Sequence, residues 1–406
     1  MKINNDTPVV VLGGNLGGLA ISRSLGKLSI DVHVFDENRQ CAAFQSKYCK
    51  TKTLASLERE GADQYCERIL SFGQTLGNKP ILIPTSDELS IFVSEYASKI
   101  KEYFRFHALD LELVHGLASK KTMFSIAKKS GVPTASAIFP QSTEEVVRFA
   151  ENTNFPIMLK GIFGNRLQSD SGKKMLIIKS PEELVSEYRK LSVFDADNLM
   201  IQEYIPGEDN QVYIFNGYFD KNSDCLAAFT GRKIRQFPIH VGCASLGECC
   251  WNEQVSLITT RFMKNIGYQG ILDIGYRYDE RDGQYKVLDI NPRVGQAFRM
   301  FVDKNGMDVV RALYLDLTDQ RVERGIPREG RRWVIEDYDI ISSFHYFQEG
   351  SIKLQDWIGS FKKLEECMWF DLQDPMPFSD MVLNLSKRAL AYIVKRALSQ
   401  NGSMSQ

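Results

Sequence analysis

Short apolar runs alternate with longer helical stretches over the first hundred residues. The runs lie at residues 8–12, 31–35 and 80–83, and they are rich in the aliphatic residues typical of buried strands. A glycine-bearing turn at 13–18 leads from the first run into a helical stretch. Because strands that alternate with helices form parallel βαβ units, the pattern predicts an open α/β sheet.

A different pattern begins near residue 119. Ser142 with Glu145 has the spacing of a capping box, and Ser180 before Pro181 marks another helix start. These signals predict a small α+β unit inserted after the first sheet. We expect a helix at 119–131, a second helix from 142, a strand at 156–160, a polar loop at 161–174, a strand at 175–178 and a third helix from 180.

The next stretch, from 199 to 292, is strand-rich and contains a single helix near 252–266. Strands are expected near 199–205, 211–215, 225–230, 271–278 and 284–290. Tryptophan and phenylalanine become frequent after about residue 330. The fold class is therefore a multidomain α/β and α+β protein. We divide it into an N-terminal α/β domain, a subdomain that contains the inserted α+β unit, a strand-rich body and an extension with a helical tail, at 1–117, 118–204, 205–330 and 331–406.

Composition narrows the class of protein. A chain of 406 residues is long enough for two or three domains. Its 50 Lys and Arg residues balance 51 Asp and Glu residues, giving a net charge of −1, which argues against nucleic acid as a partner. The apolar runs are far shorter than the roughly 20 residues of a membrane-spanning helix, so we expect no membrane span.

The eight cysteines form no CxxC pair, and the five histidines show no zinc-ligand spacing relative to them. The N-terminus passes from a polar start into a strand-like run without the longer apolar segment of a secretory signal. Together these features predict reduced thiols in a cytoplasmic protein.

The most informative segment is a predicted hairpin in which two apolar strands flank a turn of acidic residues and glycine. A five-residue loop centred on Arg281 would pair Asp273 with Asp289, and side-chain alternation places Asn291 on the same face as Asp289. Two carboxylates and an amide oxygen, with no Cys or His, are ligands typical of a hard cation such as Mg²⁺. The alternative is a solvated hairpin face whose acids have no common function.

The segment Asp289-Ile-Asn291-Pro-Arg293 resembles the [E/D]-x-N-x-R pattern of the ATP-grasp superfamily, with aspartate where most members have glutamate. The resemblance covers about residues 5–320 and points to the branch of D-aspartate ligase and carboxylate–amine ligases. It implies ATP and Mg²⁺ as cofactors, with Mn²⁺ as an alternative. The metal ligands it implies are Asp273, Asp289 and Asn291.

The resemblance also implies a set of basic residues around the phosphates. Lys120 and Lys160 are similar to the two lysines of the family, and residues 161–172 to its mobile lid. A lysine that ends a buried strand, as Lys160 does, is costly without an anion. Lys233 and Arg235 are expected on one strand face, near a triphosphate or acyl phosphate. The alternative for Lys120 is a solvated lysine on a helix. The alternative for Lys233 and Arg235 is a solvated basic turn.

A strand followed by a Pro-Gly turn resembles the hinge of these enzymes. The resemblance implies that Gln202, Glu203, Tyr204 and Ile205 contact the adenine and that Asp209 binds the ribose hydroxyls. The alternative is a plain edge strand ending in a turn.

The N-terminal glycine turn has two interpretations. After a strand, and with Asp36 downstream, it approximates the dinucleotide-binding motif of an oxidoreductase, although Asn15 replaces the middle glycine. The ATP-grasp resemblance instead implies a substrate domain, in which Gly14, Asn15 and Asp87 would bind substrate together with Arg293. We prefer the second interpretation.

The resemblance implies an ADP-forming ligase that activates a small carboxylate as an acyl phosphate and joins it to an amine. Arg293, Lys160 and Arg235 would be the catalytic residues, which spread the developing negative charge. Two other classes stay open: a nicotinamide- or flavin-dependent oxidoreductase and a non-catalytic ATP-binding regulator. Small-molecule substrates and a homodimer are the expected partners.

A basic stretch at 381–398 is expected to pack as a terminal helix, with a surface-binding amphipathic helix as the alternative.

Overall fold

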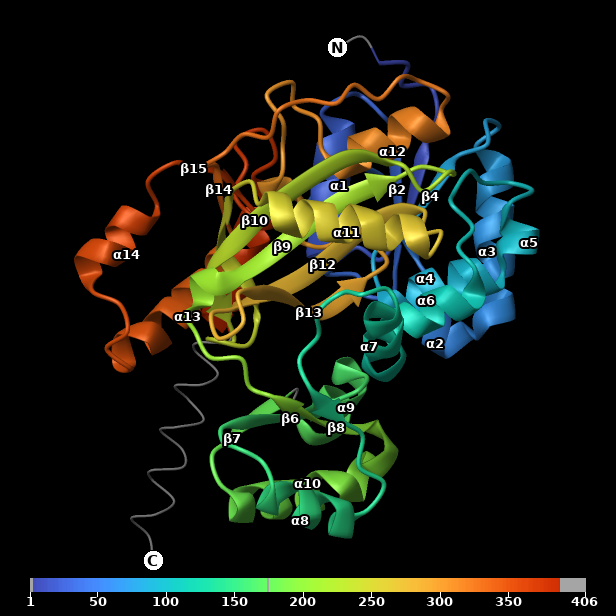
Figure 1. Ribbon diagram of the computed structural model, residues 1–406. Helices are drawn as coiled ribbons and strands as arrows, with labels where there is room; N and C mark the ends of the chain where they lie inside the picture. Colours follow the sequence, from blue (N-terminus) through green and yellow to red (C-terminus); the bar gives the residue numbers. More distant parts are fainter. Residues whose placement is uncertain (1–2, 174, 388–406) are drawn as a thin grey trace, which may run out of the picture.

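The computed structural model describes residues 3–173 and 175–387 (Figure 1). The N-terminal domain is built on a four-stranded parallel sheet in the order β3-β2-β1-β4. Its strands are β1 (Val9–Leu12), β2 (Val32–Asp36), β3 (Cys49–Leu54) and β4 (Ile81–Pro84). The predicted open α/β sheet is therefore confirmed, and β3 is an additional strand that its polar sequence, CKTKTL, did not indicate.

Helices cover both faces of this sheet because its central strand is apolar throughout. Val9 and Val11 face α1 (Leu16–Gly26), whereas Val10 and Leu12 belong to the cluster on the other face, with α3 (Ala62–Thr75) and α4 (Asp87–Glu95). The remaining helices of this domain are α2 (Leu57–Glu60), α5 (Ala97–Ile100) and α6 (Leu111–Ala118).

A small antiparallel sheet, in the order β5-β8-β6-β7, forms a separate unit that lies beneath the main body in Figure 1. Its strands are β5 (Ala137–Ile138), β6 (Ile157–Gly161), β7 (Met175–Ile178) and β8 (Leu199–Glu203). One face packs against α8 (Thr143–Glu151) and α10 (Pro181–Asp195), whose starts are capped by Ser142 and Ser180 as predicted. Helix α7 (Lys120–Lys129) leads into this unit.

The polar loop expected at 161–174 is not a loop throughout, because it contains helix α9 (Gly164–Ser171). Leu167 is fully buried in the core of the small unit, which ties this segment to the sheet. Gly172, in the left-handed region with φ +72°, ends the helix. The expectation failed because a single apolar residue among polar ones carries too little periodicity to indicate a helix.

The main body is a seven-stranded sheet in the order β13-β12-β9-β10-β11-β14-β15, antiparallel except for its last pair. The strands are β9 (Val212–Phe219), β10 (Cys225–Phe237), β11 (Cys243–Cys249), β12 (Gly270–Asp279), β13 (Gln284–Asn291), β14 (Arg332–Val334) and β15 (Leu364–Cys367). Helix α11 (Glu253–Asn265) packs on one face. Helix α12 (Val309–Leu317) packs on the other, in a core shared with α1 of the N-terminal domain.

The described part of the C-terminal extension contains strands as well as helices. Strands β14 and β15 complete the large sheet, α13 (Glu336–Gln348) packs against β10 and β11, and α14 (Leu354–Ser360) follows it in the chain (Figure 1). Arg23 of α1 binds Asp374 at 2.9 Å and the carbonyl of Met368 at 2.7 Å, which fixes the extension to the N-terminal domain. Most of the basic stretch at 381–398 lies outside the described residues.

Across the described residues, no helix is both long and apolar enough to cross a membrane.

Candidate active site

A cleft of about 1310 Å³ opens where the three sheets meet. Its walls come from the carboxyl ends of the N-terminal strands, the inner face of the small sheet, and β10, β12 and β13 of the large sheet. The C-terminal extension adds Asp337, Tyr338 and Trp369. The cleft therefore collects residues from every part of the chain that the sequence pattern distinguished.

The β12–β13 hairpin carries the predicted acids, but its register differs from the prediction. Asp273 pairs with Asn291, and Asp289 pairs with Gly275. The turn is one residue shorter than expected, since Asp279 pairs with Gln284, and a bulge after Gly275 shifts the strands again. The two aspartates are therefore diagonal neighbours rather than directly opposite each other, and they still share one face.

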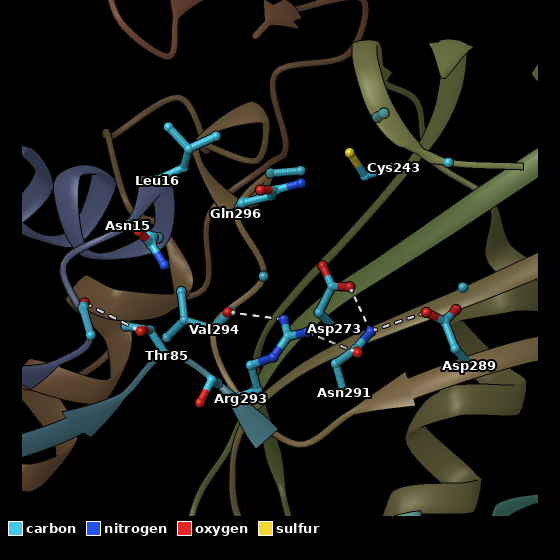
Figure 2. A pocket seen from close by; sticks show the side chains of 18 of the residues that line it. Asn15, Leu16, Thr85, Cys243, Asp273, Asp289, Asn291, Arg293, Val294 and Gln296 are labelled. Carbon is cyan, nitrogen blue, oxygen red and sulfur yellow. Dashed lines mark hydrogen bonds between the residues drawn. The ribbon is translucent and has the colours of Figure 1, made fainter. Parts of the chain in front are cut away.

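Asn291 connects these acids. Its Nδ2 lies 3.3 Å from Asp273 Oδ1 and 3.4 Å from Asp289 Oδ2, and its Oδ1 accepts a bond of 3.0 Å from Arg293 Nη2. Figure 2 shows the three side chains converging on the cleft from β12 and β13. Turning the amide over would present a third oxygen to the space between the carboxylates, because amide nitrogen and oxygen exchange places in such a flip.

The surroundings of the acids fit a hard cation. A Cβ at Gly275 would lie 2.5 Å from Asp289 Oδ1, and one at Gly295 would lie 2.2 Å from Asp273 Oδ2, so both glycines leave the room that the carboxylates occupy. Burial raises the pKa of Asp273 to about 6, Arg293 opposes this shift, and the nearby Asp289 adds to it. Two oxygen-bearing acids whose mutual repulsion a cation would relieve, with an amide beside them, match the ligand preference of Mg²⁺.

Three lysines, on β6, α7 and β10, also line the cleft. Lys160, at the end of β6, is 5% exposed, and its Nζ lies 5.9 Å from the centre of the Phe124 ring. Lys120 is the first residue of α7, and its Nζ lies 3.5 Å from the carbonyl oxygen of Ile162. Lys233 on β10 donates to the carbonyl of Gly242 at 2.7 Å, and burial lowers the pKa of its ammonium group. These three cations give the cleft a positive side suited to phosphate groups.

Arg235 does not join them, which corrects the prediction that it shares a face with Lys233. Bulges on either side of Arg235 break the alternation of β10. Its guanidinium is 2% exposed and forms two bonds of 2.8 Å to Asp339 of α13, with a third of 2.7 Å to Ser360. Arg235 therefore holds the extension against the sheet, outside the cleft.

The hinge strand β8 contributes Gln202 to the cleft lining, and the segment directly after it contributes Tyr204 and Ile205. Gln202 is 1% exposed, and its Oε1 has no hydrogen-bond partner in the protein. The side chain of Glu203 turns away and binds Arg281 at 2.6 Å. A contact of Glu203 with the cleft can thus come only from its backbone, consistent with the alternation of side chains along a strand.

Asp209 does not line the cleft, which contradicts its expected position. Its Oδ1 accepts a hydrogen bond of 2.8 Å from Gln236 Nε2 and lies 3.2 Å from His240 Nδ1. Its Oδ2 accepts a hydrogen bond from the hydroxyl of Tyr346 on α13. Gln236 and His240 line the cleft in its place. No local pattern indicates that Tyr346, on a helix more than a hundred residues later, binds this carboxylate.

The N-terminal residues take different positions. Asn15 lines the cleft at the start of α1, whereas the backbone N–H of Gly14 is bound to Asp36 Oδ2 at 2.6 Å. Asp36 Oδ1 also accepts a hydrogen bond from the backbone N–H of Asn38. The Asp36 carboxylate thus links the glycine turn to the segment that follows β2. Asp87 lies behind the cleft wall and binds Arg293 Nε at 3.1 Å.

Several lining residues were missed by the sequence reasoning. Arg277 follows Asp273 and Gly275 on the same face of β12, so alternation along the predicted strand could have found it. Trp369 and Tyr338 offered no signal, because only the tertiary structure brings the extension to the cleft.

No protein-family model matches this sequence. Among curated proteins, D-aspartate ligase of Enterococcus faecium (strain Aus0004) is 25% identical over 247 residues, which span 57% of this chain and 57% of that enzyme. The match thus covers little more than half the length of the relative.

Solved structures resemble the chain more completely. The biotin carboxylase domain of Hydrogenobacter thermophilus 2-oxoglutarate carboxylase, in complex with MgADP, ADP and bicarbonate, has a TM-score of 0.59 at 18% identity and covers 80% of this chain and 72% of that chain. N5-carboxyaminoimidazole ribonucleotide synthetase in complex with ADP has a TM-score of 0.63 at 13% identity, with 81% of each chain covered. At these identities the likeness shows a common fold.

Proposed function

We propose, from the ATP-grasp fold that this chain shares with those proteins, that it is an ADP-forming ligase joining a small carboxylate to an amine. The observation that carries the proposal is the convergence of Asp273, Asp289 and Asn291 with Arg293 and Lys160 in one cleft. An acid–acid–amide set beside several cations is the arrangement that transfer of a phosphoryl group requires.

The proposed reaction has two steps. A carboxylate oxygen of the substrate attacks the γ-phosphorus of ATP, the bond to the β–γ bridging oxygen breaks, and ADP leaves an acyl phosphate behind. The amine then attacks the acyl carbon, inorganic phosphate departs with the bonding electrons, and the nitrogen loses a proton as the amide forms. Both steps depend mainly on positioning and on stabilisation of negative charge.

Residues of this chain have distinct tasks in these steps. Asp273, Asp289 and Asn291 would hold Mg²⁺, which neutralises phosphate charge when bound. Lys160 and Lys233 offer positive charge to the phosphates, with Lys120 at the entry of the lid. Arg293 lies between the acids and the N-terminal domain and is placed to orient the carboxylate or its acyl phosphate.

The adenine would lie against β8 and the residues that follow it, where Gln202, Tyr204 and Ile205 line the cleft, and the backbone of Glu203 would add a contact. The N-terminal domain, with Asn15 beside the glycine turn, would bind the second substrate. The unit that contains α9 would close over the phosphates and limit hydrolysis of the acyl phosphate by water.

The proposal includes a cytoplasmic location, supported by eight free cysteines. It includes Mn²⁺ as a substitute metal, because oxygen ligands accept both ions. It also includes a homodimer, since a dimer is described for the biotin carboxylase domain compared above.

The test is a screen for ADP release in the presence of Mg²⁺, over amino acids and small carboxylates supplied alone and in pairs. We expect that ADP release needs two substrates together. Asp289→Asn and Arg293→Ala should each reduce the rate of ADP release by about a hundredfold or more, as expected for loss of a charge-stabilising group. Glu280→Gln, on the same hairpin but bound only to Gln211, should retain wild-type turnover.

Other results would assign another function. Magnesium-dependent ATP binding without turnover over the whole screen would indicate a regulator. A flavin or nicotinamide absorbance in the purified protein would indicate an oxidoreductase that uses the N-terminal turn.

A further inference from the structure

Arg277 has no role in the proposed reaction, yet its side chain lines the cleft. It follows Asp273 by four residues on the same face of β12, which places it about 13 Å along the strand from the metal ligand. In the sheet it pairs with Val212, the first residue of β9 after the hinge segment. Arg277 therefore lies at the hinge end of the cleft, away from the phosphates.

The guanidinium is buried and incompletely satisfied. Arg277 is 8% exposed, and its Nη2 donates to the carbonyl of Gly207 in the hinge. Its Nε has no hydrogen-bond partner, and no carboxylate of the described residues forms an ion pair with it. Burial lowers the pKa of Arg277, while Tyr204, Asp209 and Glu208 act from a distance in the opposite direction.

Such a group is costly in an isolated protein, because a buried cationic donor without an acceptor loses its hydration without replacement. Gln202 Oε1, at the same end of the cleft, is likewise buried without a partner. One unsatisfied donor and one unsatisfied acceptor thus lie on the two sides of the space between β8 and β12. A ligand that presents both kinds of group would satisfy them together.

We propose that Arg277 binds the nucleoside part of ATP by donating from Nε to N3 or N7 of the base or to a hydroxyl oxygen of the ribose, while Nη2 holds the hinge. This inference rests on the proposed function, because it requires ATP in this cleft. It makes Arg277 a specificity-determining residue that reads the nucleoside, distinct from the cations that bind phosphate.

The test compares binding of ATP with binding of 3-deaza-ATP, 7-deaza-ATP, 2′-deoxy-ATP and 3′-deoxy-ATP, each of which lacks one acceptor. Dissociation constants are measured by calorimetry with Mg²⁺ for the wild-type protein and for Arg277→Met. The wild-type protein should bind one analogue about tenfold more weakly than ATP, as expected for a hydrogen bond to a charged donor. In Arg277→Met that analogue and ATP should bind equally.

The matched control is Arg281→Met, because Arg281 is tied to the hinge through Glu203 but does not line the cleft. A purely structural tether should weaken ATP and every analogue by the same factor, and we expect this pattern for Arg281→Met. Arg277→Lys retains the charge but lacks Nε, so it should also lose the selectivity; it serves as the second variant if Arg277→Met does not fold.

The inference is overturned if Arg277→Met keeps the wild-type ratio between ATP and the analogue, or if the wild-type protein discriminates against none of the four. Absence of any ATP binding by the wild-type protein would overturn the proposed function as well. ATP binding with unchanged selectivity would overturn the role of Arg277 alone.

Discussion

Asp87 and Arg293, 206 residues apart in sequence, bind each other at the boundary between the N-terminal domain and the large sheet. The bond joins Asp87 Oδ1 to Arg293 Nε at 3.1 Å. Burial raises the pKa of Asp87, and the positive charge of Arg293 opposes that shift. The arginine of the Asp-x-Asn-x-Arg segment is therefore oriented by a carboxylate at the start of α4, in the domain proposed to bind substrate.

Replacement of Asp87 should impair catalysis without removing a group from the cleft. In Asp87→Ala, Arg293 keeps its bonds to Asn291 and to the carbonyl of Val294 but loses its third anchor. We expect about ten- to hundredfold slower ADP release, because small displacements of a positioned group have effects of that order. The KM for ATP should change little. Glu95→Ala, at the exposed end of the same helix, is the control, and wild-type turnover in Asp87→Ala would contradict the positioning role.

Gly275 should be intolerant of any side chain. The Cβ of Gly275→Ala would lie 2.5 Å from Asp289 Oδ1, so the carboxylate must move out of its position beside Asn291. We expect the Mg²⁺ concentration for half-maximal ADP release to rise about tenfold, as for loss of groups that orient metal ligands. Gly359→Ala adds the same methyl group in open space and should leave this concentration unchanged. An unchanged Mg²⁺ dependence in Gly275→Ala would argue against metal binding at Asp289.

Arg235 should matter for stability rather than for ATP binding. Removing it leaves Asp339 as a buried carboxylate without its partner, and breaking a buried pair costs about 3 kcal/mol or more of unfolding free energy. We expect Arg235→Ala to unfold at a lower urea concentration with an unchanged KM for ATP. The double variant Arg235→Met, Asp339→Leu should recover part of the stability, since no unpaired charge remains. A raised KM at normal stability would restore the catalytic role first expected for Arg235.

His107 should make stability depend on pH. Its Nε2 lies 2.6 Å from the hydroxyl of Tyr218, which donates to Asp316, and burial lowers the pKa of the imidazole despite the opposing charge of Asp316. The unfolded state therefore binds a proton near pH 6.5 that the folded state resists, so stability is lost as the pH falls through that value. Between pH 8 and pH 5.5 the melting temperature of the wild-type protein should fall more than that of His107→Gln. Equal decreases would show that folding does not lower the pKa of His107.

The sequence determined the local features of this protein. The βαβ alternation, the helix starts at Ser142 and Ser180, and the hairpin with its acid-x-Asn-x-Arg segment follow from periodicity and capping, which act between residues near each other in the chain. Lys160 stood out as a lysine that ends an apolar strand, whereas Gln202 was expected only from the resemblance of its segment to the hinge of the family.

Only the tertiary structure decided which side chains meet. A shorter turn and a bulge after Gly275 placed Asp289 opposite Gly275, and bulges on both sides of Arg235 turned its side chain toward Asp339; the residue pattern indicates none of these. The partners of Asp209 and the aromatic wall of the cleft come from the extension, far along the chain. Alternation fixes a side chain's face only while the strand stays regular, and pairing between distant segments depends on packing that no local pattern records.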